Sequence, residues 1–318
     1  MVVYRRIEDV EPVSNTVLTI GSYDGLHRGH QEIITRVVKA ARDARAICAV
    51  ITFDPHPKQI LGPAGDRFEV LMDIQMKLRL LQKAGMDIAL VIPFDREFSR
   101  TTAREFLDTI VLPRFNPHEI IVGYDHHFGH NREGDGEFLK AYGARGSFHV
   151  DVVSGVREDD KILSSTHIRD LIREGQVRQA SLELGWIYGF DANVIHGSGR
   201  GHSLTFPTAN FVPVNPAQLL PKTGVYLSRG TVKGACHYGM SNIGFRPTFG
   251  ENQFVMEIHL FDEAVEDFYG ETIEVQFLER IRDEKKFDSP KQLVAQLRKD
   301  KEYCLSQLRI YEEEEPCL

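Results

Sequence analysis

Two histidines lie in a glycine-rich segment near the start of the chain. The segment reads Gly21-Ser-Tyr-Asp-Gly-Leu-His-Arg-Gly-His30, so His27 and His30 are three residues apart with Gly29 between them. It follows the apolar run 17–20 and precedes a helical pattern, which predicts a strand-to-helix turn. A helix N-terminus offers free N–H groups and a positive dipole end, and glycines let the backbone approach an anion. Two imidazoles there can donate to a phosphate oxygen as charge builds up, which predicts phosphate chemistry.

A second segment with polar groups for an anion is Ser164-Ser-Thr-His-Ile-Arg169. Serine and threonine are good N-cap residues, so Ser165 and Thr166 predict a helix start and, taken alone, nothing more. Arg169, one turn into that helix, can hold two phosphate oxygens with its planar guanidinium. Taken alone, the histidine segment also fits a plain turn with surface imidazoles. If both segments face one ligand, together they predict a site for a triphosphate.

Two segments in the second half of the chain carry weaker signals. The glycine cluster Gly197-Ser-Gly199-Arg200-Gly201 suits phosphate contact through backbone N–H groups. It lacks the Gly-Lys-Ser/Thr ending of a Walker loop, and such a cluster is more often a flexible turn. Downstream, Glu257 and His259 are two residues apart, so in a strand they share one face. Without further context, the default interpretation of that pair is two solvated side chains.

Strand and helix patterns alternate through the first half of the chain. Apolar runs predict strands at 17–20, 46–53, 88–92, 119–122 and 148–153. Helical spacing predicts helices after residue 30, at 74–83 and at 103–111. Such alternation predicts an α/β domain with a mostly parallel sheet and helices on both faces. Ligands of such sheets bind beyond the carboxyl ends of the strands, where the chemically rich segments lie: 21–30, 52–57 and 122–135.

The pattern changes near residue 185. Helices are predicted after Ser164 and at 177–184, and from about residue 189 short β-type runs predict a small antiparallel barrel. The clearest runs are 224–229, 237–243, 254–260 and 272–278. Ser289-Pro290 predicts a final helix. Its expected buried face carries Leu293, Leu297, Tyr303 and Leu305. The sequence therefore predicts two domains, 1–185 and 186–318.

Length and composition agree with this division. The chain has 318 residues, and domains of roughly 150 residues predict two of them. Its net charge of −8 argues against nucleic acid as a partner. The four cysteines show no metal-ligand spacing and predict no disulfide framework. No apolar stretch approaches the ~20 residues of a membrane helix, and the first residues do not resemble a signal peptide, so a cytoplasmic location is expected. The oligomeric state cannot be predicted.

The chemically rich segments of the first half resemble one family of nucleotidyltransferases. Segments 21–30 and 164–169, with Thr52-Phe-Asp-Pro-His-Pro57, resemble the FMN adenylyltransferase half of bifunctional riboflavin kinase/FAD synthetases, a Rossmann-like domain with an HxGH signature. The family's Gly-x-Asp-Phe-x-Phe-Gly element is similar to Gly123-Tyr-Asp125-His-His-Phe-Gly129. There, His126 and His127 depart from the family pattern, in which an aromatic residue and often an arginine are expected. A metal site at these adjacent histidines is not expected, because they point different ways and no other ligand set is present.

This resemblance implies a reaction and a set of residues. The FMN phosphate attacks the α-phosphorus of ATP in line and pyrophosphate leaves, without a covalent enzyme intermediate. The resemblance implies that His27 and His30 stabilise the transition state and that Asp125 helps to place the flavin or the nucleotide. The remaining residues expected to bind the nucleotides are Gly21, Asp24 and Gly29 in the turn, with Ser165, Thr166 and Arg169 holding the leaving phosphates.

The second half, from about residue 189 to 304, resembles riboflavin kinases. The order and spacing of its motifs carry this resemblance, with Thr205 as a departure where the family often has glycine. The matching motifs are Gly197–Arg200, Phe206-Pro-Thr208-Ala-Asn210, Asn242-Ile-Gly244, Glu257-x-His and Arg280-x-Arg282-x-x-x-x-Phe287. The resemblance implies that Thr208 and Asn210 coordinate Mg²⁺ and that Glu257 accepts the proton of the ribityl 5′-hydroxyl as it attacks the γ-phosphorus of ATP. It also implies a flavin pocket with Arg282 and Phe287.

Taken together, the resemblances predict a bifunctional enzyme that converts riboflavin to FMN and FMN to FAD, with ATP as a substrate of both steps and Mg²⁺ as a cofactor. One alternative is a monofunctional riboflavin kinase whose adenylyltransferase half has drifted, which His126 and His127 motivate. A second alternative is a non-catalytic regulator that binds a flavin or a nucleotide. Such a regulator would not require Glu257 together with Thr208 and Asn210.

Overall fold

The computed structural model of the chain describes residues 1–63, 65, 67–146, 148–158, 161–195, 208–248, 251–262 and 268–314. The chain divides into two compact units, Met1–Ser165 and Thr166–Leu318.

The first unit is an α/β domain built on a six-stranded sheet with the order β1-β4-β3-β2-β5-β6. Every pair of neighbouring strands is parallel. The strands are β1 (Val2–Tyr4), β2 (Thr16–Ile20), β3 (Ile47–Phe53), β4 (Ile88–Ile92), β5 (Pro117–Gly123) and β6 (His149–Val153). Residues of β2 and β4 are buried throughout, as expected for strands covered on both faces.

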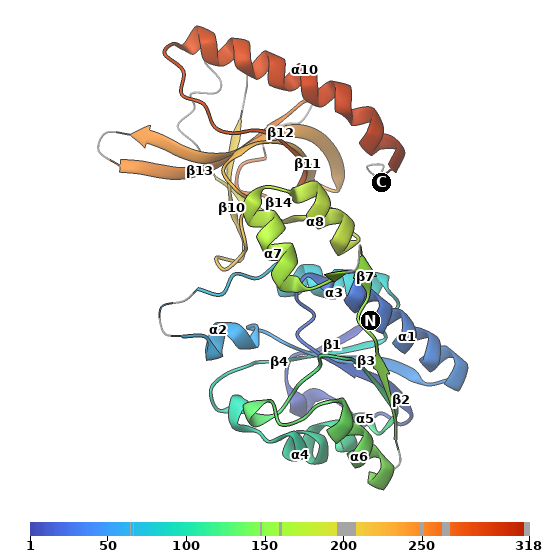
Figure 1. The fold of residues 1–318 in the computed structure, drawn as a ribbon. Coiled ribbons are helices and arrows are strands. Elements are labelled where there is room, and N and C mark those ends of the chain that lie inside the picture. The colour runs from blue at the N-terminus through green and yellow to red at the C-terminus, as the bar shows by residue number, and fades with distance from the viewer. Residues whose placement is uncertain are drawn as a thin grey trace. The chain divides into compact units, whose positions relative to one another are not determined.

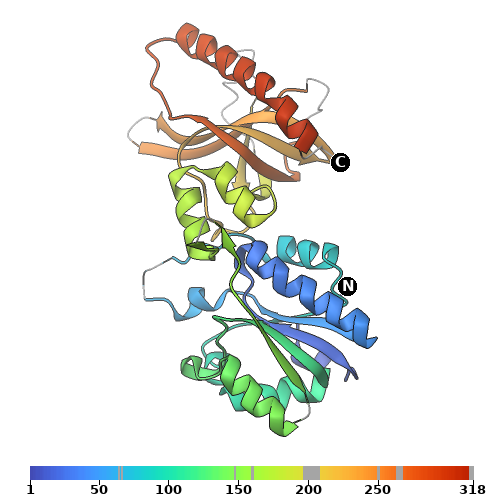
Figure 2. The same cartoon turned by 45° about the vertical axis from the view of Figure 1, so that its right-hand side comes forward.

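Helices cover both faces of this sheet. One face carries α1 (Arg28–Ala44) and α3 (Ile74–Lys83), and the other carries α4 (Ala103–Phe106), α5 (Leu112–Phe115) and α6 (Gly136–Gly146) (Figure 1, Figure 2). A π-helical turn, Leu107–Val111, joins α4 to α5. The smaller elements are helix α2 (Pro57–Leu61), strands β7 (Arg157–Glu158) and β8 (Lys161–Ile162), and the 3-10 turns Ile7–Asp9, Asp24–Leu26, Phe98–Arg100 and His130–Arg132. The predicted fold class of this half is confirmed.

The second unit is a closed six-stranded antiparallel barrel with helices at both ends of its sequence. The barrel order is β10-β13-β12-β11-β14-β9. Its strands are β9 (Gly189–Ile195), β10 (Ala209–Pro213), β11 (Gly224–Val232), β12 (Ala235–Thr248), β13 (Glu251–Leu260) and β14 (Thr272–Arg282). Helices α7 (Ser165–Glu174) and α8 (Val177–Leu184) precede it, and α10 (Pro290–Glu314) lies across it (Figure 1). The predicted barrel and terminal helix are confirmed.

The face of α10 that packs on the barrel differs in part from the predicted one. Leu297 does pack on the cluster that includes Met240 and Leu278. Tyr303 and Leu305, however, are 42% and 47% exposed. Seven residues make two helical turns, so the position that follows Leu297 on the same face is Cys304, and the buried positions are Cys304 and Tyr311.

Two further expectations concern disulfide bonds and membrane-spanning helices. Cys48 and Cys304 are buried free thiols. Cys236 is disulfide-bonded, but one such cysteine is not a disulfide framework, so the expectation that the chain has no framework stays a prediction. Across the described residues, no helix combines the length and the apolar character that a membrane span requires.

The second compact unit begins before the predicted boundary at residue 186. Helix α8 buries Val177, Ala180 and Leu184, and the Ser181 hydroxyl oxygen accepts a hydrogen bond from the Tyr188 N–H at 2.9 Å. These contacts place α7 and α8 in the same compact unit as the barrel. Which activity residues 166–185 serve therefore remains a prediction.

We expect fragments of the second unit to fold and to make FMN without the first unit. A fragment Thr166–Leu318 should be about 3 kcal/mol more stable than Gly185–Leu318, because only the longer one buries the apolar face of α8. Urea unfolding followed by the fluorescence of Trp186, the single tryptophan, measures the difference. A folded fragment with no kinase activity would show that the kinase site needs residues of the first unit.

Candidate functional site

The turn between β2 and α1 has an unusual backbone. Tyr23, Gly25 and Leu26 have positive φ values of 45°, 77° and 36°. Glycine adopts such values freely, but for Tyr23 and Leu26 they are strained, and such strain persists only where the surrounding structure holds it. Side chains hold the turn in place. The Tyr23 hydroxyl bonds to Thr19, and the Asp24 carboxylate accepts the Leu71 N–H at 3.0 Å.

The turn ends at His27, which is the N-cap of α1. Its Nδ1 accepts the N–H of His30 at 3.4 Å. The two imidazole rings stack with centroids 3.7 Å apart and an interplanar angle of 18°. The ring of Tyr23 meets His30 edge-on at 5.3 Å. The two predicted histidines are therefore brought together at a helix N-terminus, which is where an anion is favoured.

Both imidazoles lie in an environment that disfavours their charged form. Burial lowers the pKa of His27 to about 4. Burial also places the pKa of His30 well below its ordinary value, and the positive charge of Lys77 adds to this effect. Both rings are thus neutral near pH 7, and a bound phosphate would favour their protonation. The His30 Nδ1 is buried and has no hydrogen-bond partner among the described residues.

Two glycines of the turn lie close to aromatic rings. A Cβ on Gly21 would lie 2.9 Å from the ring of Tyr23, and a Cβ on Gly29 would lie 3.1 Å from the ring of His27. Larger residues at these positions would push against the two rings that shape the site.

The other predicted residues of the first unit lie at neighbouring strand ends. Asp24 is 3% exposed, and its backbone oxygen accepts the Ser165 hydroxyl at 2.9 Å, so Ser165 is held at the turn. Asp125 follows β5, the sheet neighbour of β2, and is exposed. Thr166 and Arg169 belong to the second compact unit, so their convergence with His27 remains a prediction.

His126 and His127, which depart from the family pattern, have different surroundings. His126 stacks on Phe128 with ring centroids 5.5 Å apart, in the manner of an aromatic side chain, and burial lowers its pKa to about 4. His127 is exposed and its Nδ1 lies 2.9 Å from the Asp125 carbonyl oxygen. In the described part of the chain, no three His, Cys, Asp or Glu side chains cluster as metal ligands.

The barrel brings three polar side chains into one row. Asn210 on β10 pairs with Glu257 on β13, and Glu257 pairs with Asn242 on β12. Directly paired residues of antiparallel strands point to the same face, so the three side chains are neighbours. The Thr208 hydroxyl donates to Glu257 Oε1 at 3.3 Å. Asn242 lies in a motif that matches the riboflavin kinases, but sequence reasoning assigned it no role, because its pairing with Glu257 depends on strand register.

Glu257 is half-buried and His259, on the same face, is 6% exposed. His259 is therefore not a solvated side chain, because it lies on a buried face of β13, where its paired residue on β12, Met240, is buried as well. Gly197, Gly199, Arg200 and Thr205 lie outside the described residues.

Arg282 has a partner that the sequence did not predict. Its Nε and Nη2 donate to both carboxylate oxygens of Asp300 on α10, at 2.7–3.1 Å. Its Nη1 donates to the Asp283 carbonyl oxygen at 2.9 Å. Only 13% of the Arg282 side chain and 3% of the Asp300 side chain are exposed. This buried ion pair fastens α10 to the end of β14.

Just beyond that pair, Glu284 contacts β12. Its carboxylate accepts the Phe245 N–H at 3.2 Å, and a Cβ on Gly244 would collide with it. Phe287, the last predicted flavin residue, is half-buried on the same segment. The segment that follows β14 is thus held by α10 on one side and by β12 on the other.

We expect Asp300→Asn to destabilise the second unit by about 3 kcal/mol or more, because it leaves the buried guanidinium of Arg282 without its counter-charge. Urea unfolding followed by Trp186 fluorescence measures this. The matched control is Asp170→Asn, which removes the partner of Arg173 in an exposed pair and should cost under about 1 kcal/mol. Equal effects of the two variants would contradict the role of the buried pair.

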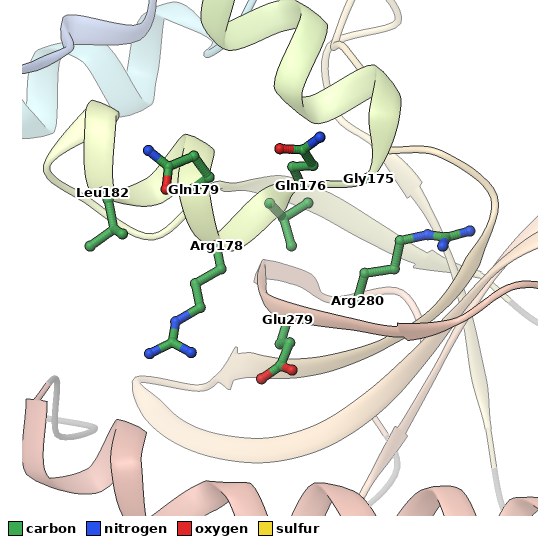
Figure 3. A pocket seen from close by; sticks show the side chains of 8 residues that line it. Gly175, Gln176, Arg178, Gln179, Leu182, Glu279 and Arg280 are labelled. Carbon is green, nitrogen blue, oxygen red and sulfur yellow. The ribbon is translucent and has the colours of Figure 1, made fainter. Parts of the chain in front are cut away.

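One open groove of about 440 Å³ lies on the second unit, and none of the predicted site residues lines it. It lies between the start of α8, which contributes Arg178, and the end of β14, which contributes Glu279 and Arg280. The two guanidinium groups point away from each other (Figure 3). They do not form a joint site for an anion.

Two imidazoles at a helix N-terminus are typical of a site for phosphate, and a carboxylate hydrogen-bonded to a hydroxyl beside two amides is typical of a site for phosphoryl transfer. The fold and the sites therefore favour the class of enzymes that transfer phosphate groups. The family model for FAD synthetase matches residues 10–167, and the one for riboflavin kinase matches residues 184–308. The chain belongs to the family of bifunctional riboflavin kinase/FMN adenylyltransferases, and it contains both domains.

Curated relatives agree with this assignment over almost the whole chain, and a solved structure shares its fold. Bifunctional riboflavin kinase/FMN adenylyltransferases from Listeria monocytogenes, Bacillus subtilis and Escherichia coli are 36%, 32% and 33% identical. The alignments cover 91–92% of this chain and of each relative. A crystal structure from Streptococcus pneumoniae, described as a macrolide-efflux protein, is 33% identical with a TM-score of 0.85, covering 95% of this chain and 97% of that one.

Proposed function

We propose that the first unit transfers the adenylyl group of ATP to FMN at the turn that carries His27 and His30. The single observation that supports this most is the stacked histidine pair at the N-terminus of α1. As the FMN phosphate attacks the α-phosphorus and pyrophosphate leaves, negative charge grows on the oxygens of the α-phosphate. Imidazole N–H groups and the free N–H groups of the first helical turn stabilise that charge.

The remaining residues of the first site have supporting roles. Gly21 and Gly29 let the backbone and the two rings pack closely, and Asp24 shapes the turn through its bond to Leu71. Asp125, at the end of the neighbouring strand, helps to place the flavin or the nucleotide. The groups that hold the leaving pyrophosphate are Ser165, Thr166 and Arg169.

For the second unit, we propose riboflavin phosphorylation at the row Asn210, Glu257 and Asn242. Glu257 accepts the proton of the ribityl 5′-hydroxyl, which then attacks the γ-phosphorus of ATP. The hydroxyl of Thr208 lies against Glu257, and Asn210 lies beside it, so hard oxygen ligands for Mg²⁺ are present and the residues fit that ion. When bound, Mg²⁺ neutralises charge on the ATP phosphates.

Further residues of the second unit shape the flavin side and the phosphate side of that site. Arg282 acts through its ion pair with Asp300, which positions the segment that ends at Phe287. The proposed phosphate contacts of Gly197, Gly199 and Arg200 remain predictions. We assign residues 1–185 to adenylyl transfer and 186–318 to the kinase.

The experiment that tests both proposals uses the purified chain with riboflavin, ATP and MgCl₂. We expect FMN to appear first and FAD to follow, and EDTA to stop both steps. Accumulation of FMN without FAD would instead support a monofunctional kinase. Flavin binding without any product would support a regulator.

A further inference from the structure

Lys77 is a buried lysine that the proposed chemistry does not use. It is 5% exposed and lies in the first half of α3 between Met76 and Leu78, which are also buried. Lysine is almost never fully buried unless its charge is paired. The contacts of its ammonium group therefore indicate what it does.

The ammonium of Lys77 joins two strand ends at the adenylyl-transfer site. It donates to the Ser22 carbonyl oxygen at 2.6 Å and to the Thr52 hydroxyl oxygen at 3.4 Å. Ser22 is the first residue after Gly21 in the turn that leads to His27, and Thr52 lies in β3, the sheet neighbour of β2. The Thr52 hydroxyl also donates to the Ser22 oxygen at 3.4 Å.

Three carboxylates stabilise the charge of this ammonium. Burial lowers the pKa of Lys77, whereas Asp24, Asp54 and Asp73 act in the opposite direction. After burial and the charge of His27, the positive charge of Lys77 also acts to lower the pKa of His30. The direct link of the ammonium to the turn is its pair of hydrogen bonds to Ser22 and Thr52.

We propose that Lys77 is a positioning residue of the adenylyl-transfer site, whose ammonium fixes the Ser22 carbonyl and with it the strained turn that sets the two histidines. A strained backbone persists only where its surroundings hold it. Tyr23 and Leu26 have φ values of 45° and 36° within that turn, and a hydrogen bond from a charged donor is stronger than a neutral one. The inference rests on the proposed function of His27 and His30.

The test uses the full chain and measures both activities. Lys77→Met keeps the side-chain length and removes the charge. We expect kcat for adenylyl transfer from ATP to FMN to fall by about 10²-fold, because small misplacements of catalytic groups have effects of this size. The KM for ATP should change little, and riboflavin phosphorylation by the same sample should be unchanged. A kcat near that of the wild type would overturn the proposal.

A second pair of variants decides the matter if Lys77→Met does not fold, as judged by hydrogen exchange over residues 16–53. Thr52→Val removes one partner of the ammonium, and kcat for adenylyl transfer should fall about fivefold. The matched control is Thr16→Val, which removes an equally buried hydroxyl that donates to the Phe115 carbonyl oxygen at 2.8 Å. Thr16 lies at the opposite end of β2, so kcat should not change. If both threonine variants keep wild-type kcat, the proposal fails.

A His30→Ala variant separates this proposal from the one on which it rests. If His30→Ala abolishes adenylyl transfer and Lys77→Met does not impair it, only the role of Lys77 is wrong. If His30→Ala leaves adenylyl transfer intact, the assignment of the site itself is wrong.

Discussion

Glu257→Gln should reduce riboflavin phosphorylation by roughly 10²–10⁴-fold, the usual effect of losing a general base. Glutamine has nearly the same shape and can still meet the Thr208 hydroxyl, but it cannot accept the proton of the attacking 5′-hydroxyl. The side chain lies between Asn210 and Asn242, so the change removes the carboxylate from the row and leaves the fold of the barrel in place.

The measurement is FMN formation from riboflavin, ATP and MgCl₂, with FAD formation from supplied FMN recorded on the same sample. The second activity should survive, because none of the residues proposed for adenylyl transfer lies in the barrel that carries Glu257. Glu274→Gln, on β14 of the same barrel, is the matched control and should keep both activities. Kinase turnover within a few-fold of the wild type would show that Glu257 is not the base.

His30→Ala should have the reverse effect and lower adenylyl transfer by roughly 10²–10³-fold. The imidazole is stacked on His27 at the N-terminus of α1, where charge develops on the α-phosphate. Its removal takes away a donor that is already in position. FMN should then accumulate from riboflavin and ATP with little FAD.

The control for this variant is His118→Ala, an exposed histidine near the amino end of β5, away from the carboxyl edge of the sheet. It should leave the output of FAD unchanged. Normal FAD synthesis by His30→Ala would refute the assignment of the histidine pair.

Much of the fold could be predicted because local patterns determine it. The helices Ile74–Lys83 and Val177–Leu184 and the strand Ile88–Ile92 lie where apolar spacing places them. Strand β1 was missed because three residues carry too little pattern. The order of the strands in the sheet depends on contacts between distant segments, which periodicity does not report.

In the candidate sites, too, local features could be predicted and contacts between distant segments could not. The histidine pair could be predicted because its spacing, its glycines and the following helix are all local. Lys77 could not, since a lysine in an amphipathic helix is usually exposed, and its partner Ser22 is 55 residues earlier in the sequence. The Arg282–Asp300 pair likewise joins a strand to a helix 18 residues later.

The boundary between the two compact units lies where no single cut preserves both proposed sites and the packing of both units. A cut before Thr166 leaves a complete barrel unit with α7 and α8 attached. The other product would lack Thr166 and Arg169, two of the groups proposed to hold pyrophosphate. A cut after residue 185 would keep those groups but carry away the apolar face of α8, which packs with the barrel unit. A cut at the boundary thus keeps all residues proposed for the kinase in one compact unit, whereas an adenylyltransferase fragment that keeps Thr166 and Arg169 would expose apolar residues of α8.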